Sequence, residues 1–221
     1  MSMIELVIFD MDGLLIDTER YWQETEREVF KKFGIEILPE IQKETFGLRS
    51  DEQIKHWLKL HPVPGLDVPT IENEYFKIIH HYFLHDAELM PGAEYILEFF
   101  RKKKLPMALA SSSPMFLIQS FVERFKFKKY FSLLHSAQNE DFGKPHPAVY
   151  ISTASQLDRN PIHCLAFEDS FNGLLAAKSA RMKAVVVPDH RTHDNGNYEI
   201  ADLILGSLTE FGENEYHIFN K

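Results

Sequence analysis

Short apolar runs recur along the chain, separated by stretches in which polar and apolar residues mix. The first run, IELVIF at Ile4–Phe9, is nearly continuous and rich in β-branched side chains, which is typical of a strand buried on both faces of a parallel sheet. Runs of the same kind predict further strands at Pro106–Ala110, Leu133–Leu134, His163–Phe167, Ala184–Val187 and Asp202–Leu205.

Apolar positions at helical spacing occupy the segments between these strands. Two such helical faces consist of Ile96, Leu97 and Phe100 and, further along, of Ile118, Phe121, Val122 and Phe125. Because strands that alternate with helices form parallel sheets, the pattern predicts an α/β fold with a Rossmann-like parallel sheet.

The alternation is interrupted between residue 15 and about residue 88. The first helical pattern there stops at Gly34, a residue suited to follow a helix end, and its apolar positions are Trp22, Val29, Phe30 and Phe33. Helical patterns return at 51–60 and 70–84, and the proline-rich loop HPVPGLDVP separates them. We therefore expect an α/β core domain at residues 1–14 and 89–221, with an all-helical insert at 15–88.

The composition is that of a soluble globular protein, with 44% hydrophobic and 26% charged residues. The formal net charge of −9 argues against a nucleic-acid partner, and it means that an anionic substrate needs a local positive site. Cys164 is the single cysteine, which fits a reducing compartment. Since neither a signal-like segment nor a run of membrane-spanning length is seen, we expect a cytoplasmic protein that does not bind membranes.

Polar side chains follow four of the predicted strands, at the edge where an open parallel sheet binds its ligand. In chain order they are Asp10 and Asp12, then Ser111-Ser112-Ser113-Pro114, then Gly143-Lys144-Pro145, and finally Glu168-Asp169-Ser170. Carboxylates, hydroxyls and one lysine are thus expected to meet at a single site.

Asp10 directly follows the first strand, where a carboxylate can act as a nucleophile, as a ligand of a hard cation, or as both. Gly13 gives the chain freedom to bend, so that the Asp12 carbonyl can reach the same cation. The alternatives are a solvated turn or a calcium-binding loop. The calcium loop is disfavoured because bulky apolar side chains follow Gly13 where further oxygen ligands are needed.

The remaining strand-end residues also have ordinary structural interpretations. Ser113 is expected to cap a helix whose first turn contains Pro114, and the amides there, with the Ser111 hydroxyl, can cradle a phosphate. Alternatively the serines only cap, Lys144 lies on the surface, and Glu168-Asp169 complements a helix dipole. The joint occurrence of these residues at successive strand ends favours one functional site.

These residues resemble a known family. FDMDGLLIDTE, LASSS, GKPHP and FEDSFNG, in this order and at these separations, are similar to motifs one to four of the haloacid dehalogenase superfamily. The insert resembles the superfamily's small helical cap, as in β-phosphoglucomutase and its phosphatase relatives. The similarity is greatest to phosphatases of the 2-deoxyglucose-6-phosphate and hexitol-phosphate type, through DGLLIDTE, FGLRSD, LASSSP, KPHPAVY, EDSFNG and VVVP.

The resemblance implies roles for the two aspartates. Asp10 would attack phosphorus in line and form an aspartyl-phosphate, while Asp12 would protonate the leaving sugar oxygen and then deprotonate the hydrolytic water. Mg²⁺ would bind Asp10, Asp12 through its carbonyl, and Asp169.

The resemblance also implies how the transferring phosphoryl group is held. Ser111, the Ser112 N–H and Lys144 would bind its oxygens. Glu168 would support the metal site or Lys144 rather than bind the cation itself.

In the cap, Arg49 matches a position where relatives place an arginine that faces the distal part of the substrate. Trp22 and Phe46 either contact a sugar ring or pack within the cap. Trp22 aligns with a histidine that assists the mutase hinge, which favours hydrolysis over mutase activity. His81 and His85 have a zinc-compatible spacing but no evident third ligand, so we expect them to face solvent or a partner.

The sequence therefore predicts a Mg²⁺-dependent phosphatase of small phosphorylated sugars or sugar alcohols, monomeric as members of this family commonly are. A phosphosugar mutase of the β-phosphoglucomutase type is the near alternative. A non-catalytic sugar-phosphate sensor is the alternative from another class, although a pure binder has no use for Asp12.

Overall fold

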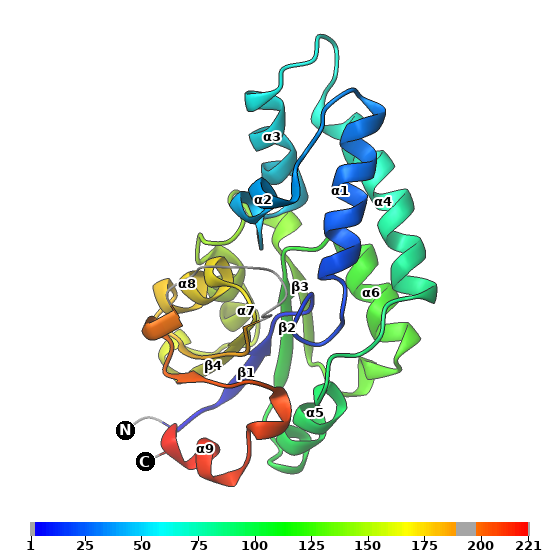
Figure 1. Ribbon diagram of the computed structural model, residues 1–221. Coiled ribbons are helices and arrows are strands. Elements are labelled where there is room, and N and C mark those ends of the chain that lie inside the picture. Colours follow the sequence, from blue (N-terminus) through cyan, green and yellow to red (C-terminus); the bar gives the residue numbers. More distant parts are fainter. Residues whose placement is uncertain (1–2, 189–197, 221) are drawn as a thin grey trace.

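The computed structural model describes residues 3–188 and 198–220 of the 221-residue chain, and a parallel sheet runs through its lower half (Figure 1). The six strands of this sheet stand in the order β3-β2-β1-β4-β5-β6. They are β1 (Leu6–Phe9), β2 (Met107–Ser111), β3 (Leu133–Ser136), β4 (Cys164–Glu168), β5 (Lys183–Val186) and β6 (Leu203–Ile204). Each predicted strand forms, with ends that differ by one or two residues.

Both faces of the sheet are covered, because side chains alternate between the faces along each strand. In β1, Val7 and Phe9 join one apolar cluster while Leu6 and Ile8 join another. The first cluster receives α5 (Ala93–Lys102), α6 (Met115–Arg124) and the chain around α9 (Glu213–Ile218), and the second receives α7 (Ala148–Gln156) and α8 (Phe171–Ser179). The predicted α/β fold is confirmed.

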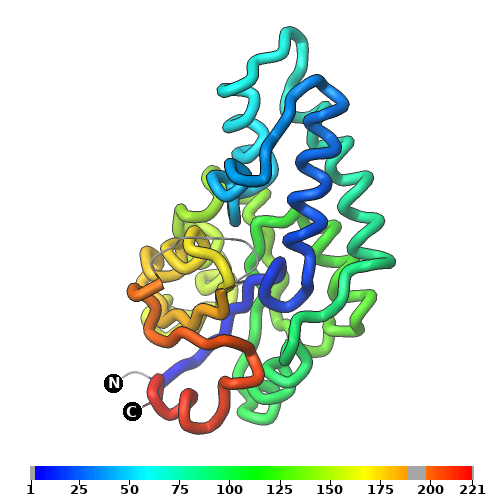
Figure 2. Tube along the Cα trace, in the orientation of Figure 1, coloured from blue at the N-terminus to red at the C-terminus, as the bar shows by residue number. Residues whose placement is uncertain are grey.

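The helical insert stands above the carboxyl ends of the strands (Figure 1), and the tube along the chain shows the insert at the top of the same view (Figure 2). Its helices are α1 (Glu19–Lys32), α2 (Pro39–Gln42), α3 (Ser50–Leu60) and α4 (Val68–His85). Short 3₁₀ turns lie at Lys43–Thr45, Phe127–Lys129, Ala137–Asn139, Pro161–His163, Tyr198–Ile200 and Leu208–Glu210. No helix in the described ranges is long and apolar enough to cross a membrane.

The boundaries of the insert helices follow local chemistry. Gly34, just past the end of α1, has a φ of +77°, as a glycine in this position typically does. Helix α4 begins at Val68, two residues before the prediction, because Pro69 is tolerated in a first turn and Asp67 accepts a hydrogen bond from the Thr70 N–H. The loop HPVPGLDVP is therefore helical at its end.

Two chain segments join the insert to the sheet, and they hydrogen-bond to each other. The Asp17 N–H donates to the Glu88 carbonyl at 2.8 Å, and the Met90 N–H donates to the Leu15 carbonyl at 3.0 Å. Ile16 and Leu89 form an isolated antiparallel bridge between these bonds. The chain thus leaves and re-enters the sheet domain at one place.

Candidate active site

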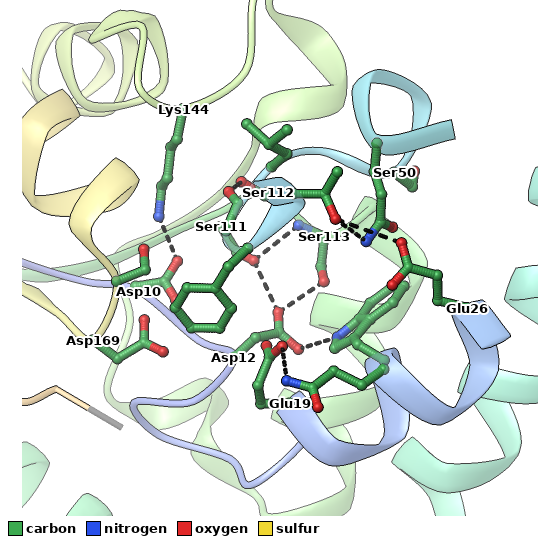
Figure 3. A pocket seen from close by; sticks show the side chains of 18 of the residues that line it. Asp10, Asp12, Glu19, Glu26, Ser50, Ser111, Ser112, Ser113, Lys144 and Asp169 are labelled. Atoms are coloured by element: carbon green, nitrogen blue, oxygen red, sulfur yellow. Dashed lines mark hydrogen bonds and ion pairs between the residues drawn. The ribbon is translucent and has the colours of Figure 1, made fainter. Parts of the chain in front are cut away.

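A cavity of about 80 Å³ lies between the strand ends and the insert (Figure 3). The parallel register aligns Phe9 with both Leu109 and Phe167, so the residues that follow β1, β2 and β4 meet at one edge. From the sheet domain the cavity is lined by Asp10, Asp12, Ser111, Ser112, Ser113, Pro114, Lys144, Asp169 and Ser170. The predicted convergence of distant segments is therefore observed.

Lys144 connects the first and fourth strands through ion pairs. Its ammonium lies 2.5 Å from Asp10 Oδ1 and 2.6 Å from Glu168 Oε1, and the residue is only 2% exposed. Burial disfavours its charge, but the carboxylates of Asp10 and Glu168 outweigh this effect and raise the pKa of Lys144. Lys144 is thus not a surface lysine.

Glu168 is fully buried and its oxygens are engaged by protein groups. Besides Lys144, the Tyr150 hydroxyl donates to its Oε1, and the Asp169 N–H donates to its Oε2 at 3.3 Å. Gly173 leaves room for this side chain, because a Cβ there would stand 2.1 Å from its carboxylate atoms. This arrangement places Glu168 beside Lys144, where it can hold the ammonium in position.

The carboxylates of Asp10, Glu168 and Asp169 have oxygens within 4.8 Å of one another. Desolvation is the main reason that the pKa of Asp10 is raised to about 8, and it also raises the pKa of Asp169. Three buried carboxylates face the single ammonium of Lys144, so a divalent cation would compensate the excess negative charge. Oxygen ligands of this kind fit a hard cation such as Mg²⁺.

Gly13 lets the chain turn closely beside Asp169. Its φ is +74°, and a Cβ at this position would lie 2.1 Å from Asp169 Oδ2. Any other residue would displace the Asp169 carboxylate from this position. The acidic site therefore requires glycine at position 13 for two reasons: the positive φ of the backbone and the lack of space for a side chain.

The Asp12 carboxylate accepts hydrogen bonds from two sides of the cavity. Thr18 Oγ1 and Trp22 Nε1 donate to Oδ1 at 2.6 and 2.9 Å, and Ser113 Oγ and Ser111 Oγ donate to Oδ2 at 2.8 and 3.3 Å. These donors fix the orientation of the carboxylate between the insert and the sheet. Trp22 thus lines the cavity and contacts Asp12 directly.

The sequence did not predict the contacts that Ser113 and Thr18 make with Asp12. Ser113 was expected as the N-cap of the following helix, but Pro114 occupies that position in α6 and the Ser113 hydroxyl bonds to Asp12 instead. Thr18 was not predicted as a site residue. It precedes α1 as an N-cap residue would, yet its side chain makes no capping bond, so only the chain path reveals its contact with Asp12.

The serines that follow β2 lie beside Asp12 and the insert. Ser111 Oγ accepts a hydrogen bond from the Ser113 N–H at 3.0 Å, and Ser112 Oγ donates to the Gly47 carbonyl at 3.2 Å. Both residues line the cavity, as Lys144 does. The three residues predicted to hold phosphoryl oxygens thus line the same cavity.

The two other predicted insert residues differ in where they lie. Phe46 lines the cavity, whereas Arg49 does not. Arg49 Nη1 donates to the carbonyls of Ala137 and Glu140 at 2.7 Å each, and its Nε lies 2.5 Å from Asp51 Oδ1. In this structure Arg49 ties the insert to the sheet domain, and its contact with substrate stays a prediction.

The histidine pair of α4 lies apart from this cavity. The rings of His81 and His85 are 4.7 Å apart, and His81 Nε2 lies 3.6 Å from Asp86 Oδ2 with both side chains largely exposed. Among the described residues, the acidic group of Asp10, Glu168 and Asp169 is the cluster whose geometry suits a metal ion, and it does not include these histidines.

The fold and this site define a hydrolase of the haloacid dehalogenase type. A profile of the haloacid dehalogenase-like hydrolase family matches residues 7–187, and the chain belongs to that family. It is 34% identical to hexitol phosphatase B of Escherichia coli (strain K12) over 204 residues, 92% of each chain. It is also 31% identical to a probable pseudouridine-5'-phosphatase of Drosophila melanogaster, across 95% of this chain and 92% of that protein.

Solved structures share the whole architecture. CbbY from Rhodobacter sphaeroides, crystallised with phosphate, superposes with a TM-score of 0.86 at 25% identity, over 95% of this chain and 97% of CbbY. A β-phosphoglucomutase from Clostridium difficile has the same fold, with a TM-score of 0.85 at 24% identity over 98% and 99% of the two chains. The predicted family, fold and hydrolase class are confirmed.

Proposed function

We propose that this protein is a Mg²⁺-dependent phosphatase of small phosphorylated sugars or sugar alcohols. One observation carries the proposal: Asp10, at the end of strand β1, lies 2.5 Å from Lys144 and within 4.8 Å of Asp169 in the cavity between the sheet and the insert. A nucleophile, a counter-charge for phosphate and a cation ligand are thus side by side.

In this mechanism Asp10 attacks phosphorus in line and becomes an aspartyl-phosphate. The Lys144 ammonium, the Ser111 hydroxyl and the Ser112 N–H hold the phosphoryl oxygens. Mg²⁺ held by Asp10, Asp169 and the Asp12 carbonyl would offset the repulsion between the anionic nucleophile and the anionic phosphate.

Asp12 performs the proton transfers. In its protonated form the Asp12 carboxyl group gives its proton to the departing sugar oxygen, and the carboxylate that remains then removes a proton from the water that hydrolyses the aspartyl-phosphate. The hydroxyls of Thr18, Ser111 and Ser113 and the Trp22 indole hold the carboxylate at the cavity wall for both steps. The two aspartates thus have different tasks because they have different neighbours.

The insert at residues 15–88 acts as a cap over the core at residues 1–14 and 89–221. Seated on the strand ends, it supplies Trp22 and Phe46 to the cavity and excludes bulk water during phosphoryl transfer. The substrate class rests on the relatives, whose names include hexitol phosphatase and (DL)-glycerol-3-phosphatase. We further propose a monomer that acts in the cytoplasm, where the buried free thiol of Cys164 stays reduced.

Phosphate release from a panel of hexose, hexitol, pentose and glycerol phosphates tests this function. We expect turnover by the wild type with Mg²⁺, loss of turnover with a chelator, and a fall of at least about 1,000-fold for Asp10→Asn, because an amide cannot replace the nucleophile. Asp86→Asn changes an exposed carboxylate just past the end of α4; it is the matched control and retains activity. Equal rates for wild type and Asp10→Asn would disprove the assignment of the nucleophile.

A phosphosugar mutase is the second candidate, since a solved β-phosphoglucomutase has this fold. β-Glucose 1-phosphate supplied with traces of glucose 1,6-bisphosphate separates the two reactions. A mutase yields glucose 6-phosphate, whereas we expect free glucose and inorganic phosphate.

A further inference from the structure

The cavity wall contributed by the insert is polar and acidic. It contains the carboxylates of Glu19 and Glu26 and the amides of Gln23, Gln42 and Gln53. Figure 3 shows Glu26 on the side opposite Asp169 and Lys144, so it faces the part of a bound substrate that lies away from the reacting phosphate. The proposed chemistry assigns no role to these five side chains.

None of the described residues that the insert contributes to this wall is a lysine or an arginine. Among the described residues that line the cavity, Lys144 is the single lysine or arginine, and its ammonium is paired with Asp10 and Glu168. Arg49 faces Asp51 and two backbone carbonyls, while Arg27 lies behind Gln42, to whose Oε1 it donates at 2.5 Å. A second anionic group on a substrate would therefore meet no lysine or arginine of the described residues at this wall.

Glu26 is held rigidly in this wall. It is 1% exposed, its Oε1 accepts from Trp57 Nε1 at 2.5 Å, and its Oε2 accepts from Gln42 Nε2 at 2.5 Å. Each carboxylate oxygen can accept two hydrogen bonds, and within the described chain Gln42 is the one donor to Oε2. Oε2 thus has capacity for a further donor, such as a substrate hydroxyl.

We infer that Glu26 is a specificity-determining residue that selects monophosphates whose distal end is a neutral polyol. Its carboxylate accepts a hydrogen bond from a distal hydroxyl and repels a second phosphate or a carboxylate at the same place. This inference rests on the proposed phosphatase function and narrows its substrate class. Sugar bisphosphates and sugar-acid phosphates are excluded by charge.

Sorbitol 6-phosphate and gluconate 6-phosphate test this inference, because they differ only in a hydroxymethyl or a carboxylate at the far end. At pH 8, above the pKa of about 7 to which burial raises Glu26, we expect kcat/KM of the wild type to favour sorbitol 6-phosphate at least about tenfold. Glu26→Gln lowers this ratio about tenfold, mainly by improving the gluconate substrate. Glu24→Gln, an exposed residue on the same helix, leaves the ratio unchanged.

A second variant keeps the test valid if Glu26→Gln does not fold. Gln53→Lys retains the Trp57 and Gln42 donors to Glu26, adds a cation to the same wall, and is expected to lower the ratio as well. Wild-type ratios near one, or ratios unaffected by both substitutions, would overturn the inference. Hydrolysis of p-nitrophenyl phosphate is measured in parallel. If the wild type does not hydrolyse this compound, the phosphatase function itself is refuted. If it does, but the ratio of the two substrates is the same in wild type and variants, only the role of Glu26 is refuted.

Discussion

At the scale of single residues, Glu26 shows how burial changes the chemistry of a carboxyl group. Desolvation raises the pKa of Glu26 from 4.5 to about 7, although hydrogen bonds from Gln42, Trp57 and Thr45 lower it in part. The native protein therefore binds a proton at Glu26 that the unfolded chain releases between about pH 4.5 and 7. The contribution of Glu26 to the free energy of unfolding is therefore fully present below about pH 4.5 and is lost as the pH rises through about 7.

The free energy of unfolding is thus expected to depend on pH through Glu26. Relative to Glu26→Gln, which does not titrate, the wild type should lose on the order of 3 kcal/mol between pH 4.5 and 8. Urea unfolding of both proteins at several pH values measures the difference. A difference that stays constant across this range would contradict the assignment, and Glu24→Gln serves as the exposed control.

At the scale of elements, the start of α3 and the segment before it connect the insert to the sheet domain. Arg49 donates to the carbonyls of Ala137 and Glu140, Glu52 Oε1 accepts from the Gly143 N–H at 2.9 Å, and Asn172 Nδ2 donates to the Phe46 carbonyl at 2.7 Å. The same segment contributes Phe46, Gly47 and Leu48 to the cavity lining. These hydrogen bonds therefore hold the insert against the strand ends.

Arg49→Ala is expected to loosen this contact. Because two charge-assisted hydrogen bonds are lost, kcat/KM should fall roughly tenfold, and backbone amides of residues 43–52 should exchange hydrogen faster. Exchange measured by mass spectrometry and steady-state kinetics check both effects. Arg101→Ala removes an exposed guanidinium on α5 and should change neither; slower exchange or unchanged kinetics in Arg49→Ala would refute the bridging role.

At the scale of the whole molecule, the insert belongs to two apolar clusters. Its outer part has a cluster of its own, which includes Val29, Phe30, Trp57 and Tyr75. The ends of α1 and α4 nearer the sheet contribute Tyr21, Ile79 and Phe83 to the cluster that also contains Phe9 and Phe100. The outer insert can therefore open locally while the sheet stays folded.

The variants Phe30→Ala and Phe100→Ala test whether the two apolar clusters unfold independently. Each removes a fully buried ring at a cost of about 3–5 kcal/mol. For Phe30→Ala we expect faster hydrogen exchange in α1, α3 and α4 with little change in β1 and β4, whereas Phe100→Ala should accelerate exchange in the strands. Equal acceleration throughout the chain in Phe30→Ala would show that the clusters unfold together.

Much of the fold could be predicted from the sequence, because strand and helix periods are short-range properties. The IELVIF run predicts β1, and the helical repeat that ends at Gly34 predicts α1. The start of α4 and the N-cap of α6 were predicted less accurately. Pro69 can either break a helix or stand in its first turn, and Ser113 can either cap a helix or bind another side chain; only packing decides between these roles.

The sequence by itself determined which residues stand at the strand ends, because the parallel sheet brings Asp10, Ser111 and Asp169 to one edge whatever the loops do. The tertiary structure alone decided which side chains contact one another. Lys144 meets Asp10 across 134 positions, Trp22 turns toward Asp12, Arg49 turns away from the cavity, and Glu26 enters it. The direction of a long side chain depends on its burial and on partners far away in the chain, and neither can be predicted from the local spacing of residues in the sequence.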